Sequence, residues 1–177
     1  MKGFVLESLD SQPALREDLQ GPPEPGEGEL VVRVRASSAN PIDNAIAAGM
    51  LRQIAEYRFP VILGRDFAGV VERSGPGSEL QEGDEAFGFV PGVGADVHDG
   101  AWTESALVPP GHAARKPSGV GFEAAGAASV AALTAMAAVD AIALSGDDTA
   151  GGRRRELVAR ARAGRDRRAD RHRLAQP

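Results

Sequence analysis

Turns rich in glycine and proline divide the first two thirds of this 177-residue chain into short apolar segments. One turn reads GPPEPGEGE at residues 21–29, and later turns read SGPGS and QEGD. Such stretches cannot sustain a strand ladder or a helix, so each of them ends an element. The segment LVVRVRA at residues 30–36 places alternate apolar residues on one face, which is typical of a half-buried strand. Many short strands followed by helix-forming segments predict a mainly β fold, a mostly antiparallel β-barrel over residues 1–120 with helical attachments.

Three further segments carry a specific prediction of secondary structure. Residues 41–48 are expected to form a short helix, because Asn40 can cap it and Gly49 can end it. Residues 2–6 are short and apolar, which indicates an edge strand. Residues 122–144 are rich in alanine and leucine and contain few β-branched residues, so they are predicted to be helical.

The composition is that of a soluble globular protein, with 42% hydrophobic and 25% charged residues. The chain has no cysteine, which excludes disulfides and thiolate zinc sites and suits a reducing cytoplasm. The first residues contain no apolar stretch of signal-peptide length. The uncharged run at residues 124–139 is shorter than the ~20 residues that a membrane span requires. We therefore predict a cytoplasmic protein without a membrane partner.

Generic motifs do not identify a function. The three histidines are far apart in the sequence, and none has the spacing of a metal site. Residues 119–124 match the pattern G-x-G-x-x-A, but Lys116 and Pro117 stand where a dinucleotide fold needs a buried strand. These motifs predict neither a metal site nor a dinucleotide-binding turn.

Charge is distributed unevenly along the chain. The net charge is −5, yet residues 151–177 hold ten of the 20 Lys and Arg residues and three of the 25 acidic residues. Such a basic segment can be an arm that binds nucleic acid or another polyanion, or a segment that lies outside the fold. No aromatic residue is interleaved with the arginines for base stacking, which makes nucleic acid the weaker alternative.

Four stretches within residues 29–145 carry a family resemblance. In order they read ELVVRVRASSANPIDNAIAAG, FPVILGRDFAGVVERSGPGSELQEGDEAFG, GAWTESALVP and AASVAALTAMAAV. They resemble the zinc-independent quinone oxidoreductases of the medium-chain dehydrogenase/reductase superfamily. The resemblance implies a GroES-like β-barrel of the alcohol dehydrogenase type over residues 1–149, which relatives follow with a Rossmann domain. It also implies reduction of a small-molecule quinone or enone by hydride transfer from NADPH.

The same resemblance suggests the residues of the site. Zinc alcohol dehydrogenases of the superfamily have cysteine at the position of Asn40 and histidine at that of Arg65, so the resemblance implies no zinc. Asn40 and Asp43 match a zinc-free Asn-Pro-x-Asp motif whose side chains border the nicotinamide, and Thr134 matches a threonine beside it. Arg65 departs from the commoner glutamate. We predict these four as cofactor-binding residues, with no metal ligand and no identified catalytic residue. Asn40 and Asp43 could equally be helix caps, and Thr134 could bond its own helical turn.

The resemblance stops near residue 149. Relatives continue there with a buried strand and a Gly-rich turn, whereas residues 150–177 begin AGGRRREL and remain rich in arginine. The codons of such a sequence, read one nucleotide later, can encode the expected Leu-Val-Val-Gly. We therefore expect a disordered or out-of-frame tail and a missing Rossmann domain. The chain alone is then expected to be inactive, to bind NADPH weakly, and to dimerise or aggregate through exposed apolar surface. The alternative is a non-enzymatic β-barrel domain whose basic arm binds a polyanion.

Overall fold

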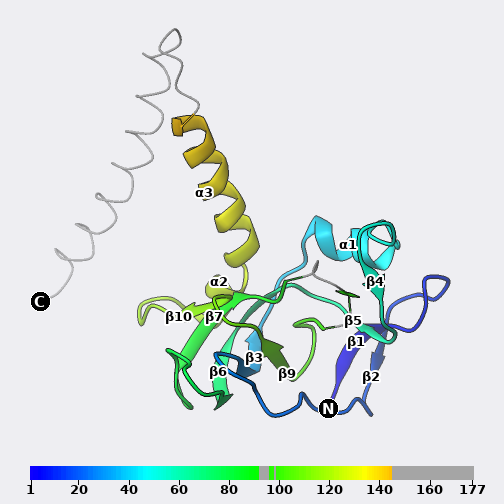
Figure 1. Ribbon diagram of the computed structural model, residues 1–177, viewed down its shortest axis with the longest axis horizontal. Coiled ribbons are helices and arrows are strands. Elements are labelled where there is room, and N and C mark those ends of the chain that lie inside the picture. Colours follow the sequence, from blue (N-terminus) through cyan, green and yellow to red (C-terminus); the bar gives the residue numbers. More distant parts are fainter. Residues whose placement is uncertain (92–95, 98, 145–177) are drawn as a thin grey trace, which may run out of the picture. The chain divides into compact units, whose positions relative to one another are not determined.

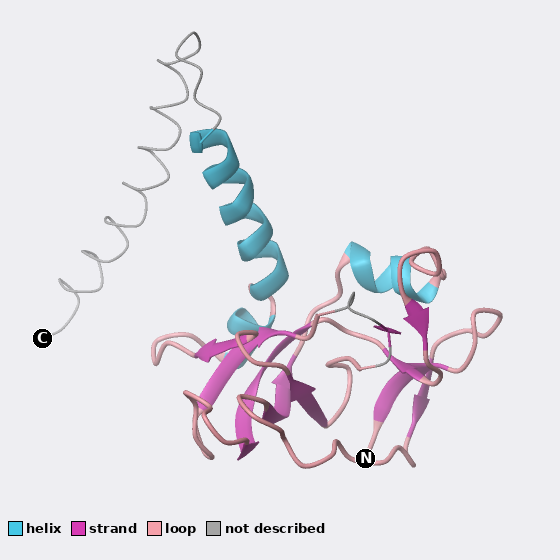
Figure 2. Cartoon of the chain, in the orientation of Figure 1, coloured by secondary structure: helices cyan, strands magenta, loops and turns pink. Residues whose placement is uncertain are grey.

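The structure is a computed structural model, and it describes residues 1–91, 96–97 and 99–144 (Figure 1). The chain divides into two compact units, Met1–Ala132 and Leu133–Pro177. Strands dominate the first unit, with a short helix at two points along it (Figure 2). This confirms the prediction of a mainly β fold. The Arg-rich segment 150–177, for which a disordered or out-of-frame tail was predicted, lies outside the described residues.

The strands of the first unit form two antiparallel sheets and a short parallel pair. The larger sheet has the strand order β10-β7-β6-β3-β9 and consists of β3 (Leu30–Ala36), β6 (Asp66–Ser74), β7 (Glu85–Phe89), β9 (Ser105–Val108) and β10 (Ala113–Arg115). The second sheet has the order β2-β1-β5 and consists of β1 (Gly3–Leu6), β2 (Ala14–Arg16) and β5 (Val61–Ile62). The parallel pair joins β4 (Glu56–Tyr57) to β8 (Asp96–Val97).

Strand β3 shows where the predicted alternation holds and where it fails. From Val32 to Ala36 the burial alternates, with Arg33 and Arg35 exposed. Val31 is also buried, although it falls on the arginine-bearing face of the pattern. The pairing of β3 with β6 shifts register between Val31 and Val32, and such an irregularity redirects a side chain. The alternation therefore predicts the strand but not the burial of its first residues.

The position of β1 corrects a prediction. Residues 2–6 were expected to form an edge strand, but β1 lies in the centre of its sheet between β2 and β5. Strand β5 is only two residues long and follows a proline-containing turn, so its local sequence pattern does not predict a strand. Its pairing with β1 is a long-range contact that the sequence near residue 2 does not encode.

Three helices are described. Helix α1 (Pro41–Ala47) begins after Asn40 and is followed by Gly49 at φ +66°, in agreement with the predicted helix. Residues 122–144 are helical in two pieces, α2 (Phe122–Gly126) and α3 (Ser129–Leu144). Among the described residues, no helix combines the length and the apolarity needed to cross a membrane.

Two apolar clusters hold the first unit together. One lies within the five-stranded sheet and includes Val32, Phe67, Val71 and Val108. The other joins the three-stranded sheet to α1 through Leu6, Ile46, Val61 and Leu63. Burial of side chains of this size contributes about 1.5–3 kcal/mol each, so the two clusters position the polar residues that lie between α1 and β6.

Candidate functional site

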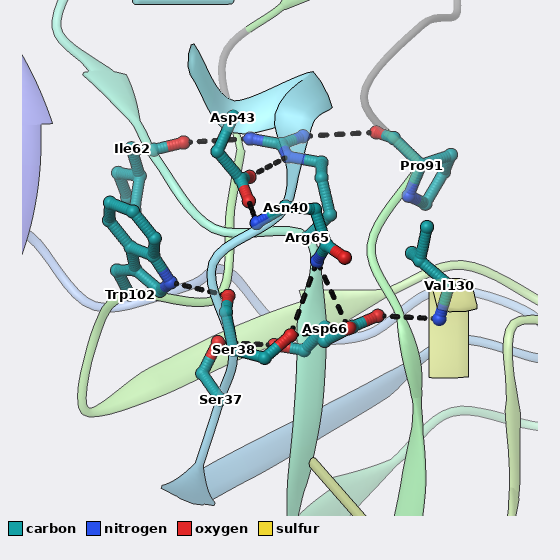
Figure 3. A network of polar contacts seen from close by, with 10 residues as sticks. All are labelled: Ser37, Ser38, Asn40, Asp43, Ile62, Arg65, Asp66, Pro91, Trp102 and Val130. Atoms are coloured by element: carbon teal, nitrogen blue, oxygen red, sulfur yellow. Dashed lines mark hydrogen bonds and ion pairs between the residues drawn. The ribbon is translucent and has the colours of Figure 1, made fainter. Parts of the chain in front are cut away.

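A network of polar side chains connects the start of α1 to the start of β6 (Figure 3). Asp66, the first residue of β6, is fully buried. Its Oδ2 accepts hydrogen bonds from Ser38 Oγ at 2.6 Å and from Asn40 Nδ2 at 3.1 Å. Its Oδ1 accepts from the backbone N–H of Val130 at 2.8 Å, in the first turn of α3. Two donors from the segment before α1 and one from the first turn of α3 therefore converge on one carboxylate.

Asn40 connects this carboxylate to α1. Its side-chain Nδ2 donates to Ser38 Oγ at 3.2 Å as well as to Asp66. Its backbone N–H donates to Asp43 Oδ2 at 2.6 Å, as in one half of a helix capping box. The capping alternative therefore applies to the carboxylate of Asp43, which accepts the Asn40 backbone N–H, while the Asn40 amide nitrogen faces Asp66.

Arg65 is the largest fully buried side chain of the described residues. Its guanidinium donates to the carbonyl oxygen of Ile62 at 2.9 Å and to that of Pro91 at 3.3 Å. Its Nε lies 3.9 Å from Asp43 Oδ1, and both side chains are 2% exposed. Neither of these two atoms has a hydrogen-bond partner among the described residues. The pair is therefore an ion pair held apart, in which the charges interact without a direct hydrogen bond.

Burial shifts the protonation of both partners. Removal from water raises the pKa of the Asp43 carboxyl, although the Asn40 N–H and the Arg65 charge act in the opposite direction. Removal from water likewise lowers the pKa of the Arg65 guanidinium, against the attraction of Asp43. In each case desolvation outweighs the partner, which agrees with the 3.9 Å separation.

Trp102 covers one side of the network. Its indole Nε1 donates to the carbonyl oxygen of Ser38 at 3.1 Å (Figure 3). The ring lies against Gly64, which has φ +87° and where any Cβ atom would overlap the indole. Glycine at position 64 thus satisfies two requirements: a left-handed backbone and room for the ring.

The structure brings together three of the four predicted site residues. Asn40, Asp43 and Arg65 share one network within the first compact unit. Thr134 lies within α3 in the second unit, with its side chain exposed. Among the described residues, no cluster of His, Cys, Asp and Glu side chains could hold a metal ion.

The sequence analysis missed Asp66, Ser38 and Trp102. One signal could have identified Asp66, because it is an acidic residue inside the apolar run VILGRDFAGVV of a buried strand. A carboxylate is retained in such a position only where several donors compensate its burial. Ser38 carried no comparable signal, since a serine before a helix is common.

The fold and the sequence have recognisable relatives. Residues 26–128 match the family model described as the alcohol dehydrogenase GroES-like domain. The chain belongs to this family. The match confirms the predicted resemblance and the GroES-like fold class. Within the described residues, this GroES-like domain is not followed by a doubly wound parallel sheet such as a Rossmann domain contains.

Individual relatives of this GroES-like chain are longer than it is. The chloroplastic quinone-oxidoreductase homolog of Spinacia oleracea is 33% identical over 143 residues, which are 80% of this chain and 42% of that protein. An alcohol dehydrogenase superfamily protein from Novosphingobium aromaticivorans has a TM-score of 0.66 at 32% identity, covering 76% of this chain and 40% of that one. The yhdH oxidoreductase from Salmonella enterica, solved with NADP, has a TM-score of 0.64 at 31% identity, covering 80% and 43%. The chain thus spans about two fifths of these relatives.

Proposed function

We propose that residues 1–149 are the GroES-like catalytic domain of an oxidoreductase that reduces a small quinone or enone by hydride transfer from NADPH. Residues 150–177 lie outside this domain in the proposal. The observation that carries it is the convergence of Asn40, Asp43 and Arg65 on one buried network inside a GroES-like domain. The spinach relative is a quinone-oxidoreductase homolog, and the Salmonella relative was solved with NADP.

The residues of the network take different parts in this proposal. Asn40 is partly exposed and can touch a ligand, whereas Asp43 and Arg65 are 2% exposed and act by holding the start of α1 in place. Thr134, exposed on α3, is kept as a proposed nicotinamide contact. The nicotinamide, when bound, supplies the hydride, and the protein supplies orientation and a surface from which water is excluded.

The donor set suits a reaction without zinc. An arginine guanidinium has no lone pair to offer a metal, and Arg65 is already bonded to two carbonyl oxygens. Asn40 directs its amide nitrogen at Ser38 and Asp66. We expect elemental analysis of the purified protein to find far less than one zinc per chain. About one tightly held zinc per chain would refute this part of the proposal.

The described residues fit the nicotinamide end of NADPH better than its phosphates. The stretch at residues 119–124 runs into α2, which is five residues long, and the preceding strand β10 pairs antiparallel with β7. A pyrophosphate site needs a parallel strand that leads into a longer helix. We therefore propose that this chain alone binds NADPH weakly and has no measurable quinone reductase activity. Titration calorimetry at moderate salt tests this, and micromolar, salt-resistant binding would refute it.

A chimera tests the catalytic role itself. Residues 1–144 would replace the matching part of the spinach relative, which would supply the remainder of that protein. We expect NADPH-dependent quinone reduction, followed as the loss of absorbance of NADPH, and a lower rate when the chimera carries Asn40→Ala. A folded chimera that reduces no quinone or enone would refute the proposed function, while a Ser37→Ala chimera serves as the matched control.

A further inference from the structure

Asp66 is placed to control the direction of a neighbouring amide. Its carboxylate is fully buried and accepts from Val130 N, Ser38 Oγ and Asn40 Nδ2. No salt bridge to this carboxylate occurs among the described residues, so hydrogen-bond donors stabilise its charge. Each donor belongs to a different part of the network: the first turn of α3, the segment before α1, and the residue that begins α1.

The orientation of the Asn40 amide follows from the chemistry of its neighbours. An ionised carboxylate can only accept, so the Asn40 atom that faces Asp66 must be the donor, Nδ2. Ser38 donates its single hydroxyl proton to Asp66 Oδ2, so its oxygen is an acceptor and shares one N–H of Asn40 with that carboxylate oxygen. The amide nitrogen is therefore directed at two acceptors, and a reversed amide would place its oxygen against both of them.

We propose that Asp66 is a positioning residue that fixes the Asn40 side chain in this orientation. The amide oxygen of Asn40 then lies on the side of the amide that is turned away from Asp66. Under the proposed function, Asn40 consequently presents this oxygen as an acceptor for a ligand N–H or O–H. This ligand preference rests on the proposed function, whereas the orientation of the amide does not.

The isosteric substitution Asp66→Asn makes a distinctive prediction. Both oxygens of the Asp66 carboxylate accept hydrogen bonds, whereas the new amide at position 66 has one oxygen and one NH₂ group. The amide can therefore accept at only one of these two positions. The Val130 N–H belongs to the backbone and can only donate, so the new oxygen belongs at that end. The new NH₂ group then faces Ser38 and Asn40. The Asn40 amide can rotate by 180° to present its oxygen, which turns its own NH₂ group out of the network.

Nuclear magnetic resonance of the full chain measures this rotation. Asn40 and Asn44 are the only two asparagines of the sequence, and Asn44 is exposed on the same helix. In the wild-type chain we expect the Asn40 side-chain proton that faces Ser38 and Asp66 to exchange with water at least about tenfold more slowly than those of Asn44, because these two acceptors hold it. In Asp66→Asn the two rates should become similar. Ser37→Ala, which removes only a bond to the Asp66 backbone oxygen, should leave the difference intact.

A reciprocal exchange separates positioning from packing. Asn40→Asp alone sets two carboxylates against each other, and Asp66→Asn alone requires the Asn40 amide to turn its NH₂ group out of the network. In the combined variant Asn40→Asp with Asp66→Asn, the NH₂ group at position 66 faces the carboxylate at position 40. Every donor then has an acceptor, and the negative charge lies at position 40. We expect its urea midpoint to recover more than half of the summed loss of the two single variants.

Two results would overturn the proposal. One is an Asn40 amide that exchanges as fast as that of Asn44 in the wild-type chain. The other is a combined variant at least as unstable as the sum of its parts. Both measurements are independent of catalysis, so a chimera without reductase activity would refute the proposed function and leave the orientation of Asn40 standing.

Discussion

Replacing Arg65 by methionine should lower the free energy of unfolding by about 3–5 kcal/mol, because it leaves a buried carboxylate without its counter-ion. Arg65 Nε lies 3.9 Å from Asp43 Oδ1, and both side chains are 2% exposed. At that separation and an effective dielectric constant of about 20, the attraction is about 4 kcal/mol. The carbonyl oxygens of Ile62 and Pro91 also lose their donor.

A double-mutant cycle isolates the ion pair from these other losses. Asp43→Asn keeps an oxygen that can accept the Asn40 N–H, and burial already disfavours the charged form of Asp43, so the loss should be small, at most about 1 kcal/mol. The combined variant Asp43→Asn with Arg65→Met leaves no unpaired charge. It should therefore be more stable than the sum of the single losses predicts. Contacting pairs couple by about 0.5–3 kcal/mol, and the attraction calculated for 3.9 Å places this pair in the upper half.

Urea denaturation provides the assay. Trp102 is the only tryptophan and lies beside the network, so its fluorescence reports local unfolding while circular dichroism reports the sheets. Arg16→Met breaks an exposed ion pair with Asp18 and should leave the midpoint nearly unchanged. A coupling energy below about 0.5 kcal/mol would refute the reasoning, since the charges would then be screened despite their burial.

Three further predictions concern Asp43, Gly64 and the exposed Met136. Burial raises the pKa of Asp43 above 3.8, so its contribution to stability is present below that pH and is lost as the pH rises through the raised value. The unfolding free energy of the wild-type chain minus that of Asp43→Asn should therefore fall from about pH 4 upward, and a rise would contradict the shift. Gly64→Ala should lower the free energy of unfolding by several kcal/mol in the same urea assay, with about 1–3 kcal/mol from the overlap with Trp102 and an additional cost from the positive φ. Gly111→Ala is the control, because Gly111 also has a positive φ but has open space, so it should lose only the backbone contribution. Met136 is 50% exposed on α3, so Met136→Gln should reduce self-association in sedimentation velocity, and an unchanged distribution would exclude this side chain from the contact.

Local rules predicted the elements that local chemistry determines. The run from Asn40 to Gly49 contains its own start and stop signals, and α1 occupies that range almost residue for residue. The alternation at residues 30–36 predicted β3 in the same way. The place of β1 within its sheet was not predictable, because it depends on the two residues of β5 more than fifty positions away.

The sequence predicted only part of the candidate site. Asn40, Asp43 and Arg65 could be named from a family pattern, but Asp66 bonds to residues 28 and 64 positions away. No periodicity encodes such contacts. The burial of Arg65 was equally hidden, since arginine is rarely buried without a partner and the partner here lies on a separate helix.

The two buried carboxylates of the network are stabilised by different means, and the difference bears on what the site can bind. Asp43 has a cation at 3.9 Å, so this pair contributes little net charge. Asp66 has neutral donors in place of a cation, and its negative charge is spread toward Ser38, Asn40 and the first turn of α3. The Asn40 amide is polarised by that charge, because one of its N–H groups points at the carboxylate and its oxygen lies on the opposite side of the amide. An electron-poor ligand group that carries an N–H or O–H is favoured beside such an oxygen, whereas a developing oxyanion is repelled. In the proposed reaction, a donor for the substrate oxygen therefore has to be a residue other than Asn40.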